Sequence, residues 1–259
     1  MPPEFSLLDL KMQDDIAIAT LQRADKRNAI NDELLNELDM LFSTPPSDAR
    51  AMILQGAGEH FCAGLDLIER LSRPKRSPFD GVRHSRKWHS VFSKIQHGEI
   101  PIVSVLKGGV IGGGLELAAA THVRVAESTS FFQLPEGQRG IFVGGGGSVR
   151  IPRIIGAGRM TEMMLTGRKY SALEGQAIGL AHYVVEAGQG LQHAIELAKK
   201  IAGNAYLSNY AIINSISRIH DMSVDDGLFT ESMVAAITRT SGESEGRIAA
   251  FFESRSRQK

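Results

Sequence analysis

Two short, continuous apolar segments restrict the fold of this chain more than any other feature of its sequence. Residues 49–56 (ARAMILQG) and 100–108 (IPIVSVLKG) each hold an apolar run that stops at a glycine. Such a run is typical of a strand that is buried on both faces of its sheet. Helical patterns come after both segments, so we predict an α/β architecture with parallel strand pairing.

The segments around these strands fit the same architecture. Alternating apolar and polar residues over 5–13 and 16–22 predict a β-hairpin. Asn31 is placed to cap a helix whose first turn carries Asp32 and Glu33. The other elements that we expect are a surface loop over 71–81, a helix that carries Trp88, a glycine-led helix over 112–122, and strands at 123–126 and 130–135.

Strand patterns stop near residue 190, and the rest of the chain has helical periodicity. The four periodic segments are residues 190–204, 206–221, 226–241 and 242–259. Because their apolar faces need a surface to cover, they must pack on the core or on a neighbouring subunit. We therefore predict a core domain over 1–190 and a helical region over 191–259.

Charge and composition restrict the possible partners. The 29 basic and 29 acidic residues balance, so no overall field attracts nucleic acid or an anionic membrane. No apolar run approaches the roughly 20 residues of a membrane span, and the start MPPEFSLLDL has no features of a leader peptide. The single cysteine, Cys62, is expected to be a packed apolar side chain rather than a nucleophile. It fits a reducing compartment, so we expect a cytoplasmic protein.

Two glycine clusters lack the motifs that bind nucleotides. Gly112 and Gly114 fit the first two positions of G-x-G-x-x-G, but Leu117 stands at the last. The second cluster, residues 144–147, places Val149 at the third glycine position. Neither cluster contains a P-loop or a G-x-S-x-G nucleophile elbow, and no histidine or cysteine motif predicts a metal site. What remains is chemistry by backbone donors and carboxyl groups.

The first cluster stands at the start of a predicted helix, where backbone N–H groups can stabilise a substrate oxygen that becomes negatively charged. The first N–H groups of a helix have no partner within the helix and lie at its positive end. Three consecutive glycines, 112–114, would let a substrate oxygen approach these donors closely.

Three blocks of the sequence resemble a known family. They are HFCAGLDL at 60–67, KGGVIGGGLELA at 107–118, and Pro135-Glu136 with the later glycines and RIIG at 153–156. In this order, over roughly residues 10–190, they resemble the enoyl-CoA hydratase (crotonase) superfamily, and AFFE at 250–253 resembles its C-terminal helix. The resemblance implies a spiral of strand-strand-helix turns. It also implies that 191–259 is a trimerisation region, giving a homotrimer or a homohexamer of two trimers.

The resemblance also implies the catalytic positions. Backbone N–H groups at the positions of Leu65 and Gly113 would form an oxyanion hole, and Glu116 and Glu136 match the two glutamates of hydratases. Adding water to a conjugated thioester puts charge on the carbonyl oxygen, removes a proton from water and delivers a proton to the α-carbon, which calls for two carboxyl groups. We expect Glu116 to be the base and Glu136 the proton donor, with the resting position of the proton left open.

Further residues are candidates for contacts with acyl-CoA, which would be the substrate and not a cofactor. They are Lys26, Arg27, Ala63, Asp66, Leu67, Trp88, Gly112 and Phe251. A second basic cluster, Arg73, Lys75 and Arg76, could hold CoA phosphates. Structural explanations compete: Asp66 suits a helix cap, Trp88 suits a helix core, and exposed basic clusters are often only solvated. We expect no other cofactor and no metal.

The function that these residues favour is enoyl-CoA hydration, a hydro-lyase reaction of fatty acid metabolism. Two alternatives stay open: another crotonase reaction, such as isomerisation or thioester hydrolysis, and an RNA-binding or structural relative. The glutamate pair argues against the first, and the balanced charge argues against the second. Residues 133–150 resemble the branch that includes methylthioacryloyl-CoA hydratases, so we expect a small or heteroatom-bearing enoyl-CoA.

Overall fold

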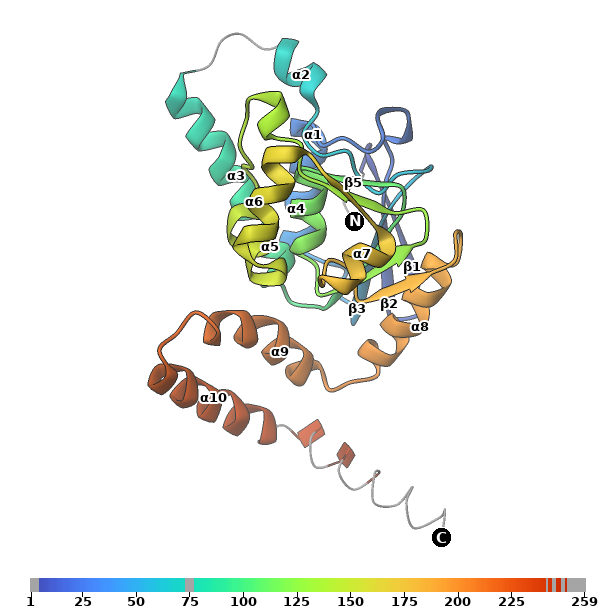
Figure 1. The fold of residues 1–259 in the computed structure, drawn as a ribbon. Helices are drawn as coiled ribbons and strands as arrows, with labels where there is room; N and C mark the ends of the chain where they lie inside the picture. The colour runs from blue at the N-terminus through green and yellow to red at the C-terminus, as the bar shows by residue number, and fades with distance from the viewer. Residues whose placement is uncertain (1–4, 73–76, 241, 244–245, 248–249, 251–259) are drawn as a thin grey trace.

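A six-stranded sheet forms the centre of the computed structural model, which describes residues 5–72, 77–240, 242–243, 246–247 and 250 (Figure 1). The first two strands form an antiparallel hairpin, and the other neighbouring strands pair in parallel. In pairing order the strands are β1 (Leu8–Gln13), β2 (Ile16–Leu21), β3 (Ala51–Gly56), β4 (Ile102–Leu106), β6 (Val123–Glu127) and β9 (Tyr183–Val185). The predicted hairpin and the predicted parallel pairing of the two apolar strands are confirmed.

Helices fill the intervals between the strands. The described helices are α1 (Asp32–Ser43), α2 (Leu67–Ser72), α3 (Pro78–Gln96), α4 (Gly113–Ala119), α5 (Gly147–Ile155), α6 (Ala157–Thr166), α7 (Ala172–Ala177), α8 (Gly190–Ala202), α9 (Tyr206–Ile219) and α10 (Val224–Arg239), with the 3-10 helices η1 (Ala24–Lys26) and η2 (Gly137–Arg139). Helix α1 begins as predicted, because the Asn31 side chain accepts a hydrogen bond from the N–H of Leu34 at 2.9 Å. Among these helices, none combines the length and the apolar character that crossing a membrane requires.

A smaller sheet runs beside the large one and completes the spiral. Strand β5 (Gly109–Ile111) pairs in parallel with β7 (Phe131–Gln133), and β7 pairs antiparallel with β8 (Lys169–Ser171). The chain passes from β4 to β5 and then into α4, and later from β6 to β7 and then, after η2, into α5. Each passage adds one strand to each sheet before a helix. This is the strand-strand-helix recurrence that the resemblance implied.

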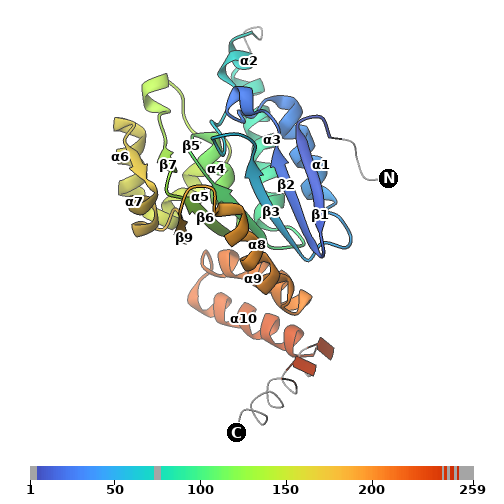
Figure 2. The ribbon, with the colours of Figure 1, turned by 90° about the vertical axis from the view of Figure 1, so that its right-hand side faces the viewer.

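Both faces of the large sheet are covered by helices, as the continuous apolar strands predicted. On one face α8 packs Ala194, Ala198 and Ala202 against strand side chains such as Ile53. On the other face α1, α3 and α4 pack against the opposite set of strand side chains, which includes Leu54 (Figure 2). Successive residues of β3 therefore enter two different cores.

The predicted surface loop over residues 71–81 is wrong in part. Residues 71 and 72 end α2, and α3 begins at Pro78. Ser77 accepts a hydrogen bond from the N–H of Asp80 at 3.2 Å, and the carboxylate of Asp80 accepts one from the N–H of Ser77 at 3.1 Å. This capping box with a proline in the first turn is a helix-start signal, which the prediction took for loop composition. The basic cluster of Arg73, Lys75 and Arg76 lies outside the described residues.

The helical region after residue 190 has one part on the sheet and one part away from it. Helix α8 covers the sheet, whereas α9 and α10 pack on each other away from both sheets (Figures 1 and 2). The amide of Asn214 in α9 donates to the carbonyl of Gly98 at 3.0 Å and ties this pair to the core. Large apolar side chains of the pair stay exposed: Tyr210, Ile212, Ile216, Leu228, Phe229, Met233 and Ile237.

Three of the four predicted helical segments are thus confirmed, and few residues of 242–259 are described. The division into a core domain over 1–190 and an oligomerisation region over 191–259 stays a prediction.

Candidate active site

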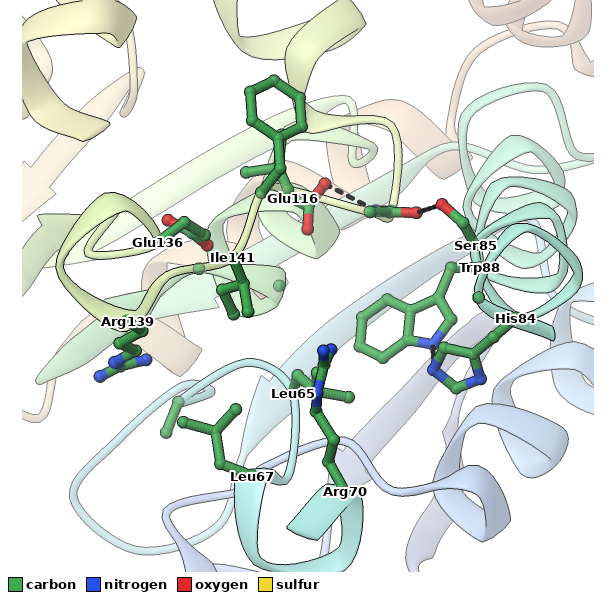
Figure 3. A pocket seen from close by; sticks show the side chains of 18 residues that line it. Leu65, Leu67, Arg70, His84, Ser85, Trp88, Glu116, Glu136, Arg139 and Ile141 are labelled. Atoms are coloured by element: carbon green, nitrogen blue, oxygen red, sulfur yellow. Dashed lines mark hydrogen bonds between the residues drawn. The ribbon is translucent and has the colours of Figure 1, made fainter. Parts of the chain in front are cut away.

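A pocket of about 250 Å³ lies where the loop before α2, helix α3, the start of α4 and the segment before α5 come together (Figure 3). Its lining residues are Ala63, Leu65, Leu67, Arg70, Gly81, His84, Ser85, Trp88, Gly112, Gly113, Glu116, Glu136, Arg139, Ile141, Phe142, Val143, Gly144 and Gly145. Apolar walls combined with a few polar groups are typical of small-molecule sites.

The backbone nitrogens of Leu65 and Gly113 lie close together at this pocket. A β-carbon built on Gly113 would lie 3.3 Å from the nitrogen of Leu65, and one built on Gly64 would lie 2.8 Å from the nitrogen of Gly113. Gly64 also has a φ of 85°, which side chains disfavour. Within the part of the chain that the structure describes, neither N–H has a hydrogen-bond acceptor. Both donors are therefore free for a ligand oxygen.

Glu116 lies in the first turn of α4, and its carboxyl group is buried beneath the second glycine cluster. The residue is 3% exposed, and its Oε1 accepts hydrogen bonds from the N–H groups of Gly145 at 2.8 Å and Gly147 at 2.7 Å. Figure 3 shows the bond to Gly145. A β-carbon on Gly147 would lie 2.6 Å from Cγ of Glu116, so glycine leaves the room that this carboxyl occupies.

The pKa of Glu116 reflects opposed influences. Burial raises the pKa, while the N–H groups of the glycine cluster and the charge of Arg150 act to lower it. The net result is a raised pKa, because burial outweighs the donors and the positive charge that favour the ionised carboxylate.

Glu136 enters the same pocket just before η2 and has different surroundings. It is 5% exposed, and its Oε2 is buried with no hydrogen-bond partner among the described residues. Gly112 packs against its other oxygen, because a β-carbon there would lie 2.8 Å from Oε1. Burial, together with the negative charge of Glu116, raises the pKa of Glu136 to about 7, although its own backbone N–H and the charge of Arg139 oppose the shift. This carboxyl group is thus suited to hold a proton near neutral pH.

Comparison with known proteins identifies the family of this chain. The sequence model of the enoyl-CoA hydratase/isomerase family matches residues 11–258. The chain belongs to this family. A short-chain-enoyl-CoA hydratase from Clostridium acetobutylicum is 30% identical over 255 residues, which cover 97% of each chain.

Solved structures of hydratase/isomerase relatives share the fold. A Rhodopseudomonas palustris protein described as a predicted enoyl-CoA hydratase is 44% identical, with a TM-score of 0.93 over 98% of this chain and 97% of that one. The enoyl-CoA hydratase of Bacillus anthracis is 30% identical, with a TM-score of 0.90 over 96% and 97% of the two chains. The crotonase superfamily and its spiral fold, both implied by the resemblance, are confirmed.

Several residues of this chain that the sequence suggested for acyl-CoA contacts line the pocket described above. Ala63, Leu67, Trp88 and Gly112 are among them. Trp88 also packs edge-on against Phe92 with ring centroids 5.4 Å apart. Both interpretations of this tryptophan, pocket wall and helix core, therefore apply.

Other predicted contact residues do not line the pocket. Asp66 accepts hydrogen bonds from the N–H groups of Ile68 and Glu69 and lies 2.9 Å from the guanidinium of Arg23, so it caps α2 as the competing explanation expected. Lys26 and Arg27 lie at the end of η1, outside the pocket lining. Phe251 lies outside the described residues. Contacts of these residues with CoA stay predictions.

Four polar residues of the pocket were missed, although helical spacing could have found them. Arg70 follows Leu67 by three residues in α2, and Arg139 follows Glu136 by three residues across η2, where side chains three apart align. His84 and Ser85 precede Trp88 by four and three residues in α3 and share its face.

The described residues contain no cluster of three or more His, Cys, Asp or Glu side chains that could hold a metal ion. Cys62 is fully buried, and burial raises the pKa of its thiol to about 12. That thiol stays protonated at neutral pH and acts as a packed side chain.

Proposed function

We propose that the chain is an enoyl-CoA hydratase, which adds water across the α,β double bond of an acyl-CoA thioester to give a 3-hydroxyacyl-CoA. The observation that carries this proposal is the pair of buried carboxyl groups, Glu116 and Glu136, in a pocket with two N–H groups that have no acceptor among the described residues. Family membership alone leaves hydration and isomerisation open, because the family name covers both.

The two N–H groups would bind the thioester carbonyl oxygen. When the oxygen of water bonds to the β-carbon, the π electrons shift through the α-carbon onto this carbonyl oxygen. Fixed donors at Leu65 and Gly113 stabilise that charge, typically by about 3 kcal/mol for each donor. Because both donors belong to the backbone, a change of side chain would not remove them.

The two glutamates would exchange protons with the water and the α-carbon. Ionised Glu116 takes a proton from the attacking water, and protonated Glu136 gives its proton to the α-carbon as the enolate electrons return to form the C–H bond. The N–H donors at Glu116 favour its ionised form. The absence of a donor at Oε2 of Glu136, among the described residues, and a pKa of about 7 favour the acid form there.

A small acyl group fits this pocket best. Its volume is about 250 Å³, and apolar walls formed by Trp88, Ile141 and Val143 favour a compact, uncharged group. We therefore keep the hypothesis of a short or heteroatom-bearing enoyl-CoA of the methylthioacryloyl type. Steady-state rates over a panel of enoyl-CoA thioesters, from crotonyl-CoA to longer chains, test it. A specificity constant that rises with chain length would contradict it.

We also propose assembly into a trimer or a hexamer. The exposed apolar side chains of α9 and α10, such as Phe229 and Ile237, form faces that the described part of the chain leaves uncovered. Sedimentation equilibrium at micromolar concentrations should give three or six subunits. A stable monomer would contradict this assembly and any contact of Phe251 with a neighbour's ligand.

Product analysis is the direct test of hydration. Incubation with crotonyl-CoA should give 3-hydroxybutyryl-CoA, detected by mass spectrometry, with loss of the enoyl absorbance. Release of free CoA thiol would indicate a hydrolase, and conversion of the α,β double bond to a β,γ double bond without hydration would indicate an isomerase. Calorimetry with a saturated acyl-CoA supplies the control: no binding at millimolar ligand would contradict any acyl-CoA enzyme.

A further inference from the structure

We infer that Arg150 is a positioning residue, which fixes the glycine segment 144–147 from behind and thereby sets the location and ionisation of Glu116. The inference rests on the proposed function, in which Glu116 is the base. Arg150 does not line the pocket of Glu116. Arg150 would therefore affect the reaction indirectly, by holding the backbone of the glycine segment and by the effect of its charge on Glu116.

The glycine segment is held from both sides. Its N–H groups at Gly145 and Gly147 donate to Oε1 of Glu116. Its carbonyl groups point the other way: the carbonyl of Gly144 accepts a hydrogen bond from Oγ of Ser85 at 2.6 Å, and the carbonyl of Gly145 accepts one from Nη1 of Arg150 at 3.1 Å. The peptide plane between Gly144 and Gly145 is thus bonded at both ends, by Ser85 and by Glu116. Arg150 holds the next two planes: its guanidinium bonds the carbonyl of Gly145, and its backbone N–H donates to the carbonyl of Gly146, in the plane that carries the N–H of Gly147. Planes held in this way cannot rotate freely, so the donors of Glu116 stay aimed at it.

The guanidinium of Arg150 is itself firmly placed by helix α3. Its Nε donates to Oε1 of Gln96 at 2.6 Å, and its Nη2 donates to Oγ of Ser93 at 3.3 Å. Gly146 has a φ of 93°, and a side chain there would run into the guanidinium. Glycine at position 146 therefore both permits the left-handed turn and leaves room for the guanidinium.

The charge of Arg150 acts on Glu116 and also on His97, whose pKa it helps to lower. Within the described residues no carboxylate makes a hydrogen bond or an ion pair with this guanidinium, whose partners are a carbonyl, an amide and a hydroxyl. A half-buried cation without an ion-pair partner acts on the titratable groups around it, since protein screens a charge less than bulk water does. Arg150 lowers the pKa of Glu116, and Glu116 in turn raises the pKa of Arg150 against the effect of burial.

Arg153, three residues further along α5, provides a matched control. Its guanidinium is bound by the carboxylate of Asp221 at 3.0 Å and by the carbonyl of Val149 at 2.7 Å, and it makes no hydrogen bond to the glycine segment. Removing it changes the net charge as much as removing Arg150 does. Any effect of overall charge on the pH profile would therefore appear in both variants.

The first arm of the test uses hydration kinetics. Arg150→Met should lower kcat by roughly 10- to 100-fold with a much smaller change in KM, because misaligned donors affect the reaction more than ground-state binding. The acid limb of its kcat/KM profile should move to higher pH by about one unit, since the ionised base has lost a nearby cation. Arg150→Lys should restore the limb but only part of kcat. Arg153→Met should change neither.

The second arm does not require catalysis. We would measure Tm of the wild type, of Arg150→Met and of the Glu116→Gln derivative of each protein across a pH series. Ionising Glu116 removes stability as pH rises, because its pKa is raised in the folded state. The Tm difference between Arg150→Met and its Glu116→Gln derivative should be larger than the difference between the wild type and Glu116→Gln. It should also level off at a higher pH.

The outcomes separate the two proposals. A wild type that hydrates no enoyl-CoA would overturn the proposed function, and the thermal arm would still decide the electrostatic role of Arg150. If Glu116→Gln changed Tm equally at every pH in the wild type and in Arg150→Met, this inference would be overturned. An active Arg150→Met variant whose acid limb of kcat/KM did not shift would also overturn it. If Arg150→Met fails to fold, Arg150→Gln, which retains hydrogen-bonding capacity without charge, takes its place in both arms with the same expected shifts.

Discussion

Glu116 and Glu136 are buried carboxyl groups in the same pocket, and their surroundings are opposite in kind. Two backbone N–H groups donate to Glu116, whereas the buried Oε2 of Glu136 has no partner among the described residues. Both pKa values are raised by burial. The difference teaches that burial alone does not assign an acid and a base: backbone donors from the glycine segment favour the anion of Glu116, whereas the backbone donor that acts on Glu136 is its own N–H.

Removing either carboxyl group should have the largest effect. Glu116→Gln and Glu136→Gln keep the shape of the side chain but cannot exchange a proton, so each should lower kcat by roughly 10² or more. Binding of a saturated acyl-CoA, measured by calorimetry, should stay largely unchanged.

The double variant sharpens this prediction. Because both groups act on one water, the double change should cost less than the product of the two single effects. Near-normal hydration in Glu136→Gln, combined with abolished hydration in Glu116→Gln, would contradict the two-carboxylate assignment. A single-base isomerase or hydrolase would then be the better interpretation.

A smaller effect should follow from changing the backbone that holds Glu116. In Gly147→Ala, the added methyl group would lie 2.6 Å from Cγ and 2.8 Å from Oε1 of Glu116, so the carboxylate must move. We expect kcat to fall by about 10-fold or more, because small displacements of reacting groups are costly. Gly158→Ala is the control, since a β-carbon there meets nothing within 4 Å. Equal rates for Gly147→Ala and the wild type would show that the position of Glu116 matters little.

The different surroundings of Glu136 should also appear in stability. Its pKa rises from 4.5 to about 7 in the folded protein, so the protein gives up as much as about 3 kcal/mol between these pH values as the buried group ionises. Glu136→Gln avoids this loss. Its Tm should exceed that of the wild type by several degrees above pH 7, and the gap should shrink toward pH 5. The exposed control Glu59→Gln should show no such trend. A gap independent of pH would mean that Glu136 ionises as it does in water.

The sequence predicted the parts of the fold that repeat along the chain or follow a local rule. The apolar runs in β3 and β4 and the Asn31 cap of α1 were correctly predicted for that reason. Strands β5, β8 and β9 have three residues each, too few to show a period, and they were not predicted. Strand β7 is equally short but lies inside the predicted strand over 130–135. The start of α3 was missed although Ser77 and Asp80 carry its signal, because Pro78 was taken as a mark of a loop.

In the candidate site, too, some features could be predicted from sequence motifs and others depend on the folded structure. The motifs led to Glu116, Glu136, Leu65 and Gly113, and these positions meet at one pocket. The contrast between the two carboxyl groups could not be predicted, since it depends on contacts formed only in the folded chain. Gly145 and Gly147 are about 30 residues from Glu116, and Arg150 is fixed by Gln96, 54 residues away.

The pH dependence of kcat/KM for a small enoyl-CoA tests the assignment of acid and base most directly. If Glu136 must be protonated to deliver its proton, the specificity constant should fall about tenfold per pH unit above a limb near pH 7, because the pKa of Glu136 is about 7. At low pH it should fall again as Glu116 becomes protonated, because burial raises the pKa of that base above its ordinary value. A specificity constant that stays level or rises through pH 7 and above, in a protein that remains folded, would contradict the account.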